Sequence, residues 1–284
     1  KVLQDTGAVI CAAGAGLAPA DKKLYALRDV TATVEAIPLI ASSIMSKKIA
    51  EGTSALVLDV KTGSGAFMSD PKKAAELART MVQLGIDAGV KTRALVTAMD
   101  VPLGLTAGNA LEVRESIEVL AGGGPADVVE LTILLAREMI DAAGIVGKDP
   151  AVALQDGSAM DHWRRMIAAQ GGDPDAKLPV AREQYVITAE NSGTMITMDA
   201  MKVGVSAWRL GAGRSKQGEK VQAGAGIEMH AKPGDYVKAG APLLTLHTDE
   251  PERFERALEI LDGAISIKEG GTVNRLPLVI ERIG

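Results

Sequence analysis

Apolar residues recur every three to five positions between residues 19 and 51, which is the spacing of one buried helical face. They are Val30, Val34, Ile37, Ile40, Ile44 and Ile49. Asp21 is a residue type that caps the start of a helix, and Pro38 interrupts the pattern because proline breaks a helix interior. The pattern therefore predicts two helices, capped by Asp21 and separated near Pro38.

The period changes after this segment. Residues 54–60 are almost continuously apolar, which is typical of a buried parallel strand, and residues 93–100 have the same character. Between them, Asp70 followed by Pro71 marks the start of a helix that ends near residue 84. This stretch predicts a strand, a helix and a second parallel strand.

A second helix and a third follow the strands. Asn109 and Glu112 have the spacing of a capping box that opens one helix, and residues 127–143 have the pattern of another. Strands that alternate with helices indicate an α/β layer with a parallel or mixed sheet, whose ligand sites lie beyond the carboxyl ends of the strands.

The pattern of hydrophobic and polar residues changes again near residue 180. Short β-type runs lie at residues 185–188, 194–197, 227–230, 236–237 and 243–247, with helical patterns at 200–210 and 252–264. We expect an α/β part followed by a smaller α+β part that is divided from it near residue 180.

Composition narrows the class of protein. The chain has 284 residues, of which 24% are charged and 47% hydrophobic, as in an ordinary globular protein. Only 2% are aromatic and the net charge is −5, so the chain lacks the stacking platforms and the basic field that nucleic-acid binding needs. No apolar run reaches the length of a membrane helix. The single Cys11 fits a reducing compartment, and we expect a cytoplasmic protein with neither nucleic acid nor membrane as a partner.

Three polar residues stand out in the helical segment. Ser43 and Lys47 are four residues apart and share a helix face, and Arg28 lies on the neighbouring helix. A hydroxyl, an ammonium and a guanidinium together suit a planar ligand with carbonyl oxygens. Solvated charges at a helix rim explain the same spacing, and the spacing alone favours that interpretation.

The glycine loop Gly63-Ser-Gly65-Ala-Phe67 follows the first predicted strand. Backbone N–H groups in such a loop can bind an anion, but the loop matches neither common phosphate-binding motif, so a plain strand-to-helix turn is an equal alternative. His162, His230 and His247 have no metal spacing, and we interpret them as packing or surface residues.

Two short motifs in the last third resemble those of biotinyl and lipoyl carrier domains. Ala200-Met-Lys202 resembles the biotin-attachment tripeptide, and the segment KPGDYVKAGAPL resembles the hairpin of these domains. In the carriers the hairpin precedes the lysine, whereas here it follows Lys202, which we expect on a helix. The order argues against attachment, while the C-terminal α+β domain still resembles a biotinyl/lipoyl-like hybrid.

A long, nearly continuous pattern resembles the thymidine/pyrimidine-nucleoside phosphorylase family. It runs through APADKKLYALRDVTATVEAIPLIASSIMSKKIAEG, ALVLDVKTGSGAFM, PLGLTAGNALEVRESIE, MIAAQGGD and WRLGAGR to the PGD hairpin. The resemblance implies an incomplete α/β phosphate lobe (residues 1–19 and 52–180), part of a small helical lobe that binds the pyrimidine (20–51), and a C-terminal α+β domain (181–284).

The resemblance also implies an activity. Members of this family are homodimeric pentosyltransferases that cleave pyrimidine nucleosides with phosphate and need no organic cofactor. By position, Arg28, Ser43 and Lys47 match the base-binding residues, with Arg28 and Lys47 as the catalytic pair, and Phe67 matches an apolar wall.

Some family members bind a monovalent cation, potassium. Its ligands match the main-chain oxygens of Leu103 and Thr106 and the carboxylate of Glu115.

The start of the chain departs from the family pattern. The family's phosphate-binding motifs have no counterpart, and Cys11-Ala-Ala-Gly14 stands where we expect the motif GQT. We therefore expect a C-terminal two-thirds of a phosphorylase that is inactive alone. A non-catalytic interaction module and a phosphorylase of a related substrate, such as a nucleotide or an anthranilate compound, stay open, and so does the choice between uridine and thymidine.

Overall fold

In the computed structural model, the segment with the helical period forms two helices. α2 (Pro19–Thr31) and α3 (Ile37–Ala50) follow the short helix α1 (Val2–Thr6). Pro38 lies in the first turn of α3, where its missing N–H group breaks no helical hydrogen bond, so the predicted separation is confirmed. The structure describes residues 1–12, 14, 16–31, 36–214, 219–274 and 276–284, without the side chains of residues 26–31.

The first sheet is mixed. β1 (Ala55–Thr62) and β2 (Lys91–Ala98) are parallel, and β10 (Val279–Ile283) pairs antiparallel with β2. α4 (Pro71–Asp87) connects the two parallel strands, and the Asp70 carboxylate accepts hydrogen bonds from the backbone N–H groups of Lys72 and Lys73 at 2.7 and 3.1 Å. The predicted strand–helix–strand unit and its cap are confirmed.

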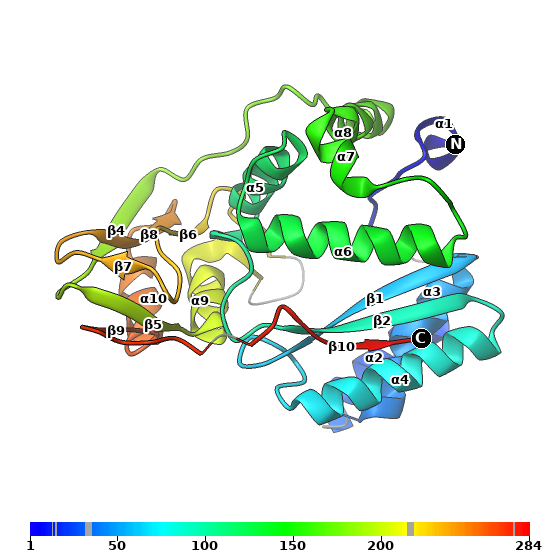
Figure 1. Cartoon of the computed structure of the whole chain (residues 1–284), viewed down its shortest axis with the longest axis horizontal. Helices are drawn as coiled ribbons and strands as arrows, with labels where there is room; N and C mark the ends of the chain where they lie inside the picture. The colour runs from blue at the N-terminus through cyan, green and yellow to red at the C-terminus, as the bar shows by residue number, and fades with distance from the viewer. Residues whose placement is uncertain (13, 15, 32–35, 215–218, 275) are drawn as a thin grey trace.

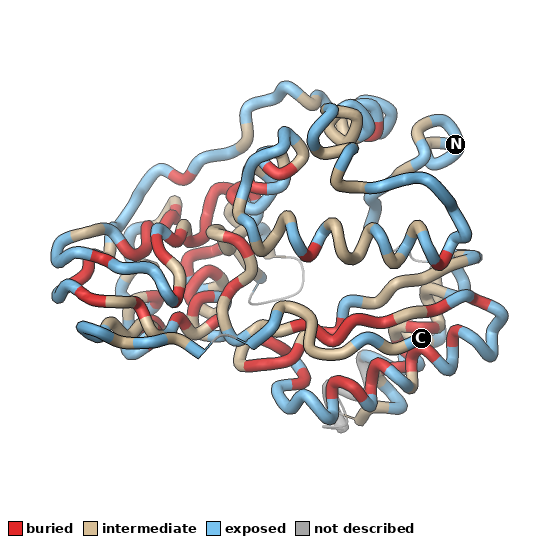
Figure 2. Tube along the Cα trace, in the orientation of Figure 1, coloured by how far each residue is buried: buried red, intermediate tan, exposed pale blue. Residues whose placement is uncertain are grey.

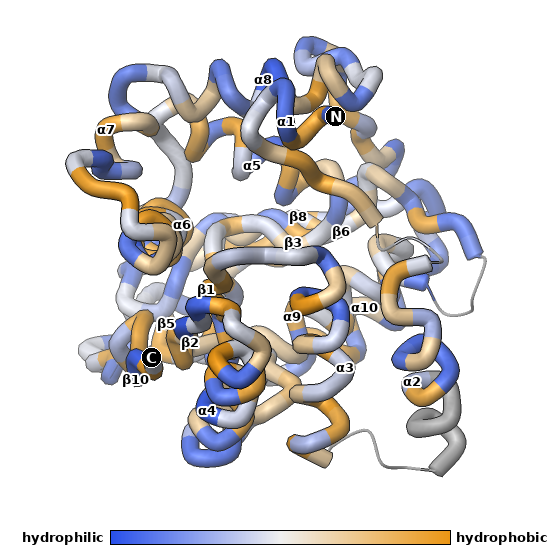
Figure 3. The backbone as a smooth tube through the Cα atoms, turned by 90° about the vertical axis from the view of Figure 1, so that its right-hand side faces the viewer, coloured by the Kyte–Doolittle hydropathy of each residue, from blue (hydrophilic) through white to orange (hydrophobic). Residues whose placement is uncertain are grey.

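Helices lie on both faces of this sheet. α3 and α4 pack on one face, and α6 (Ala126–Ala142) lies over the other (Figure 1). Hydrophobic and hydrophilic residues alternate along α4 (Figure 3), as in a helix with one buried face. The core beneath α3 and α4 consists of alanine, valine, leucine and methionine: Ala41, Met45, Val60, Met68, Ala74, Ala75, Leu77, Ala78, Met81, Val82, Ala94 and Val96. These small and flexible side chains let the helices approach the strands closely.

The capping box at the start of α5 (Ala110–Leu120) does not form. The Asn109 side chain instead donates a hydrogen bond to the carbonyl of Ala212 at 2.8 Å, and Glu112 accepts one from the N–H of Gly108 at 2.8 Å. A contact with the C-terminal part of the chain has replaced the predicted local cap. α7 (Pro150–Gln155) and α8 (Ser158–Ala169), for which we made no prediction, follow α6.

The C-terminal part contains two antiparallel sheets. One has the strand order β3 (Thr106–Gly108), β6 (Gly226–Met229), β8 (Pro242–Thr248) and β4 (Glu183–Thr188), and the other β7 (Tyr236–Val237), β5 (Gly193–Met198) and β9 (Ile265–Lys268). With α9 (Ala200–Ala207) and α10 (Arg253–Leu261) they enclose a second core, where buried residues are concentrated (Figure 2). The predicted mixture of short strands and helices in this part of the chain is confirmed.

Strands on the two sides of the predicted boundary near residue 180 pair with each other. β10 belongs to the sheet of β1 and β2, although it ends the chain, and β3 pairs with β6 in the C-terminal sheet. The two parts therefore share backbone hydrogen bonds: the first sheet and the sheet that contains β3 each combine strands of both parts, whereas β7, β5 and β9 all belong to the C-terminal part.

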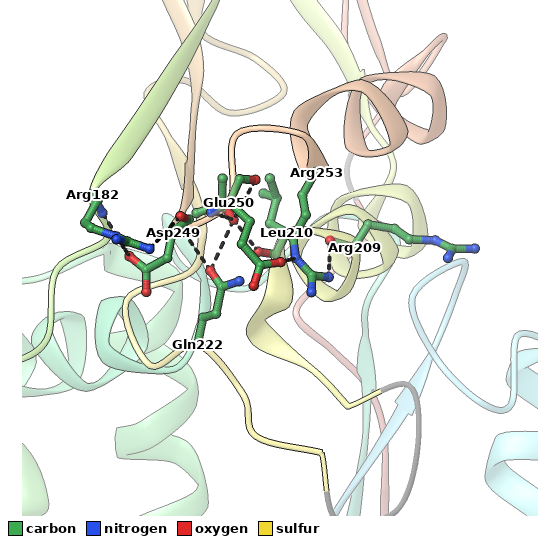
Figure 4. Close-up of polar contacts among 8 residues, drawn as sticks. Arg182, Arg209, Leu210, Gln222, Asp249, Glu250 and Arg253 are labelled. Carbon is green, nitrogen blue, oxygen red and sulfur yellow. Dashed lines mark hydrogen bonds and ion pairs between the residues drawn. The ribbon is translucent and has the colours of Figure 1, made fainter.

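The helix after residue 200 ends differently from the prediction. α9 stops at Ala207 and continues as the π-helical turn η1 (Trp208–Ala212), in which Gly211 has φ 110°. Polar groups join this turn to the end of β8 (Figure 4): the Thr248 hydroxyl donates to the Leu210 carbonyl at 2.7 Å, and Gln222 accepts from the N–H of Asp249 at 2.7 Å. These bonds fix a non-standard turn beside the core.

Lys202 lies in α9, as expected, and donates to the carbonyl of Asp262 at 2.5 Å. It is not on a hairpin, which agrees with the argument against biotin attachment. Among the described residues, no helix is long and apolar enough to cross a membrane.

Candidate functional site

The first candidate site lies where α3 faces α2, with Ser43 buried and Lys47 partly exposed. Lys47 Nζ lies 2.5 Å from Asp21 Oδ2 and 3.2 Å from Ser43 Oγ, so one ammonium joins α3 to α2. The Ser43 residue is 6% exposed and the Asp21 side chain 15% exposed. Asp21 was expected to cap α2, but the helix begins at Pro19, and its carboxylate instead holds Lys47 in place.

A cavity of about 340 Å³ lies between these helices and the edge of the sheet. Its lining comes from α2, α3, α4, the end of β1 and the loop that follows β1: Tyr25, Ile40, Ser43, Ile44, Asp59, Val60, Lys61, Phe67, Met68, Leu77 and Met81. Phe67 is 61% exposed although it is aromatic, as expected of a pocket wall. The structure thus brings Ser43 and Phe67 into one cavity, with Lys47 attached to Ser43 by a hydrogen bond.

The glycine loop positions Phe67 but does not offer its N–H groups to an anion. The N–H of Ser64 donates to the Asp100 carboxylate at 3.1 Å, and that of Gly65 donates to the Met99 carbonyl at 2.9 Å. Because these donors are already paired within the protein, the structure favours the plain turn over the anion-binding interpretation.

Arg28 belongs to α2, but its side chain lies outside the described residues. Its assignment to the base therefore stays a prediction. The sequence interpretation also missed two residues of the cavity, Asp59 and Lys61, because they lie within a strand that is otherwise apolar. Their alternation with Val60 and Thr62 was the available signal, since alternate strand residues face opposite sides of a sheet.

A second cavity, of about 320 Å³, contains the three residues expected to hold a cation. Leu103, Thr106 and Glu115 all line it. Glu115 is 9% exposed and accepts a hydrogen bond from the N–H of Leu105 at 2.7 Å. Gly104 has φ +70°, and a Cβ there would lie 2.0 Å from Glu115 Oε2, so only glycine lets the loop fold this closely over the carboxylate.

The donor types of this set fit a monovalent cation. Main-chain oxygens of Leu103 and Thr106 and the buried carboxylate of Glu115 are hard oxygen ligands, which K⁺ prefers, and the three residues line the same cavity. Burial raises the pKa of Glu115, and Asp127 raises it further, whereas the Leu105 N–H, the Thr106 hydroxyl and Lys232 oppose the rise. A cation would favour the ionised form. No cluster of three His, Cys, Asp or Glu side chains suited to a metal occurs among the described residues.

We expect Glu115→Gln to change how stability depends on pH and potassium. The raised pKa means that the folded protein binds the proton more tightly than the unfolded chain, so Glu115 favours folding below its unfolded pKa and loses this contribution as pH rises through the folded pKa. Without K⁺, the melting temperature of the wild type should fall over that range and that of Glu115→Gln should stay flatter. At neutral pH, K⁺ should stabilise the wild type alone.

The matched control is Glu118→Gln, an exposed glutamate on the same helix. It should behave as the wild type in thermal melts with KCl and with a large organic cation. An equal K⁺ effect on the wild type and Glu115→Gln would contradict the assignment of Glu115.

Two of the histidines have partners within the C-terminal sheet. His247 is 4% exposed and its Nε2 lies 3.0 Å from Glu228, which also pairs with Arg114 of α5 at 2.8 Å. His230 Nε2 lies 2.7 Å from the Thr245 hydroxyl. His247 is thus a packing residue and His230 an exposed surface residue, as predicted for histidines without metal spacing.

Two family models match the chain. The model of the glycosyl transferase family, a/b domain, matches residues 1–162, and that of the pyrimidine nucleoside phosphorylase C-terminal domain matches residues 194–268. The first covers the whole lining of the first cavity and most of that of the second, which also includes residues of α9, and the second model covers most of the C-terminal sheets.

Curated relatives agree with the models. A protein of Mycobacterium tuberculosis (strain H37Rv) named thymidine phosphorylase is 61% identical over 281 residues, which cover 99% of this chain and 65% of the relative. Proteins named pyrimidine-nucleoside phosphorylase are 41% identical in Staphylococcus epidermidis (strain ATCC 12228; 100% of this chain, 67% of the relative) and 44% identical in Bacillus subtilis (92% and 63%). The chain thus spans about two-thirds of the length of these relatives, and 65% of the first. It belongs to the thymidine and pyrimidine-nucleoside phosphorylase family.

Proposed function

We propose that the protein containing this chain catalyses the reversible phosphorolysis of pyrimidine nucleosides, of the uridine or thymidine type. The observation that carries the proposal is the Asp21–Lys47–Ser43 arrangement: Ser43 lines a cavity that also contains Phe67, and Asp21 holds the Lys47 ammonium 3.2 Å from the Ser43 hydroxyl. A donor pair beside an apolar wall suits a planar base with carbonyl oxygens.

In this reaction a phosphate oxygen bonds to C1′ of the pentose while the bond from C1′ to the base nitrogen breaks. The electron pair of that bond leaves with the base, so negative charge develops on its carbonyl oxygens and the sugar becomes oxocarbenium-like. Lys47, together with Arg28 from α2, stabilises this charge more in the transition state than in the bound nucleoside. Ser43 orients the base, and Phe67 excludes water from one of its faces.

The remaining parts have roles consistent with this reaction. Residues 20–51 belong to the lobe that binds the base and forms the homodimer, and residues 1–19 and 52–180 belong to the lobe that faces phosphate. Residues 181–284 form an α+β domain related to biotinyl/lipoyl hybrids. Leu103, Thr106 and Glu115 would hold potassium, whose positive charge would fix the loop that contains Leu103 and Gly104. The chemistry requires no organic cofactor. The exposed thiol of Cys11 suits the cytoplasm.

The test is phosphate-dependent release of free base by the full-length protein. Uridine and thymidine, each with and without phosphate, should yield uracil or thymine and a pentose 1-phosphate only when phosphate is present. Release from a nucleotide or an anthranilate riboside instead would indicate a related substrate. No turnover and no base binding, with dimerisation retained, would favour the interaction module.

A further inference from the structure

The cavity that contains Ser43 and Phe67 also contains an ion pair that the base does not need. Asp59 and Lys61 lie on the same face of β1, two residues apart, and both line this cavity. Lys61 Nζ lies 2.6 Å from Asp59 Oδ2, and each side chain is 24% exposed. The pair is therefore partly buried and open to the cavity.

A third residue fixes the pair in position. The parallel register places Thr97 of β2 beside Lys61, and the Thr97 hydroxyl accepts a hydrogen bond from Lys61 at 3.0 Å and donates one to Asp59 Oδ1 at 2.5 Å. Thr97 is 0% exposed, so the three groups form a closed triangle anchored in the sheet. Rigid polar groups of this kind set the geometry of a binding site at low entropic cost.

The charges and donors of the pair indicate what it can bind. The ammonium has three N–H donors, and contacts with Asp59 and Thr97 use two of them within the described residues. The Asp59 carboxylate has lone pairs beyond the two that these contacts use. The pair has no net charge, so it offers little attraction to an anion such as phosphate. One donor beside one acceptor instead matches a hydroxyl group, which both accepts and donates.

We propose that Asp59 and Lys61 bind a hydroxyl group of the pentose while Ser43 and Lys47 hold the base. The inference rests on the proposed function, because it assigns the sugar part of the same nucleoside. It makes the pair a determinant of pentose specificity, with Thr97 as the residue that positions it.

The experiment is calorimetric titration of the full-length protein, without phosphate, using nucleoside and free base as separate probes. Lys61→Met keeps the length of the side chain and removes the ammonium, and the double variant Asp59→Asn/Lys61→Met avoids an unpaired carboxylate. Both should bind uridine or thymidine about tenfold or more weakly, as loss of a hydrogen bond to a charged group predicts. Their affinity for uracil or thymine should stay within about twofold of the wild type.

Nucleosides that lack the 3′- or the 5′-hydroxyl identify the group that is bound. One of these analogues should bind the wild type weakly, and the variants should no longer distinguish it from the parent nucleoside. Unchanged nucleoside affinity in both variants would overturn the proposal. So would an equal loss of free-base affinity, or, in a separate titration with inorganic phosphate alone, a loss confined to phosphate. If the wild type binds neither base nor nucleoside, the proposed function itself fails.

Discussion

Replacing Lys47 with alanine in the full-length protein is expected to lower kcat/KM for phosphorolysis of uridine or thymidine by about a hundredfold or more. This is the usual cost of removing one fixed donor from a group that becomes charged in the transition state. Steady-state kinetics with saturating phosphate measures it. Affinity for the free base should fall as well, because in the proposed function the same ammonium donates to the base oxygen.

The fold should tolerate this change. The Lys47 side chain is 31% exposed and that of Asp21 is 15% exposed, so the ion pair is only partly open to solvent. Its loss should lower the free energy of unfolding by about 1–2 kcal/mol, between the cost of an exposed pair and that of a buried one. A thermal melt should therefore shift by a few degrees while the protein stays folded and activity is lost. Lys47→Arg should not restore activity, since a planar guanidinium cannot keep the geometry of an ammonium between Asp21 and Ser43.

Lys48→Ala is the matched control. Lys48 is the next residue of α3 and pairs with Glu51 at 3.0 Å on the exposed side of the helix. It has the same charge and the same helix position within one residue, but its ammonium donates to the Glu51 carboxylate and not to Ser43 or Asp21. Normal activity of Lys47→Ala, or an equal loss in Lys48→Ala, would exclude a specific role for Lys47.

The parts of the fold that sequence patterns predicted are those with local causes. Asp70 followed by Pro71 determines the start of α4 within the chain itself, and continuous apolar residues determine β1 and β2. The break at Pro38 has the same local origin. Each of these signals acts over a few residues, so no knowledge of distant contacts was needed.

The parts that were missed depend on distant contacts. Asn109 has the sequence of a cap, but a carbonyl 103 residues away in the chain competes for its side chain. β10 pairs antiparallel with β2, which lies far from it in the chain. The sequence of a strand does not indicate which distant strand it pairs with. For the same reason, the predicted boundary near residue 180 did not include the strand pairings that connect the two parts.

The candidate site was predicted only where helix periodicity could place residues together. Ser43 and Lys47 are four residues apart, and their contact follows from the helix. Asp21 was interpreted as a cap because its type and position suited one, and only the packing of α2 on α3 shows its contact with Lys47. Asp59 and Lys61 were not predicted as cavity residues, because a mostly apolar strand predicts burial on both of its faces.

Gly65 shows how tightly the loop before Phe67 is packed. An added Cβ would lie 2.6 Å from the Ala200 Cβ and 2.8 Å from the Met99 carbonyl oxygen. Neither neighbour can move freely, because Ala200 begins α9 and Met99 follows directly on β2. The N–H of Gly65 also donates to that carbonyl, so the loop cannot shift away without losing a hydrogen bond. The glycine is required by close contact between the loop, β2 and α9.

We therefore expect Gly65→Ala to lower the free energy of unfolding by about 2–3 kcal/mol, as overpacking of a tight contact does. Denaturant unfolding of the full-length protein measures the change. Gly204→Ala, in α9, is the control: outside its own helix backbone no atom lies within 4 Å of the added Cβ, and alanine in a helix interior is favoured over glycine, so this variant should gain about 0.5–1 kcal/mol. If both variants had the same sign, the close contact at Gly65 would not be what selects glycine there.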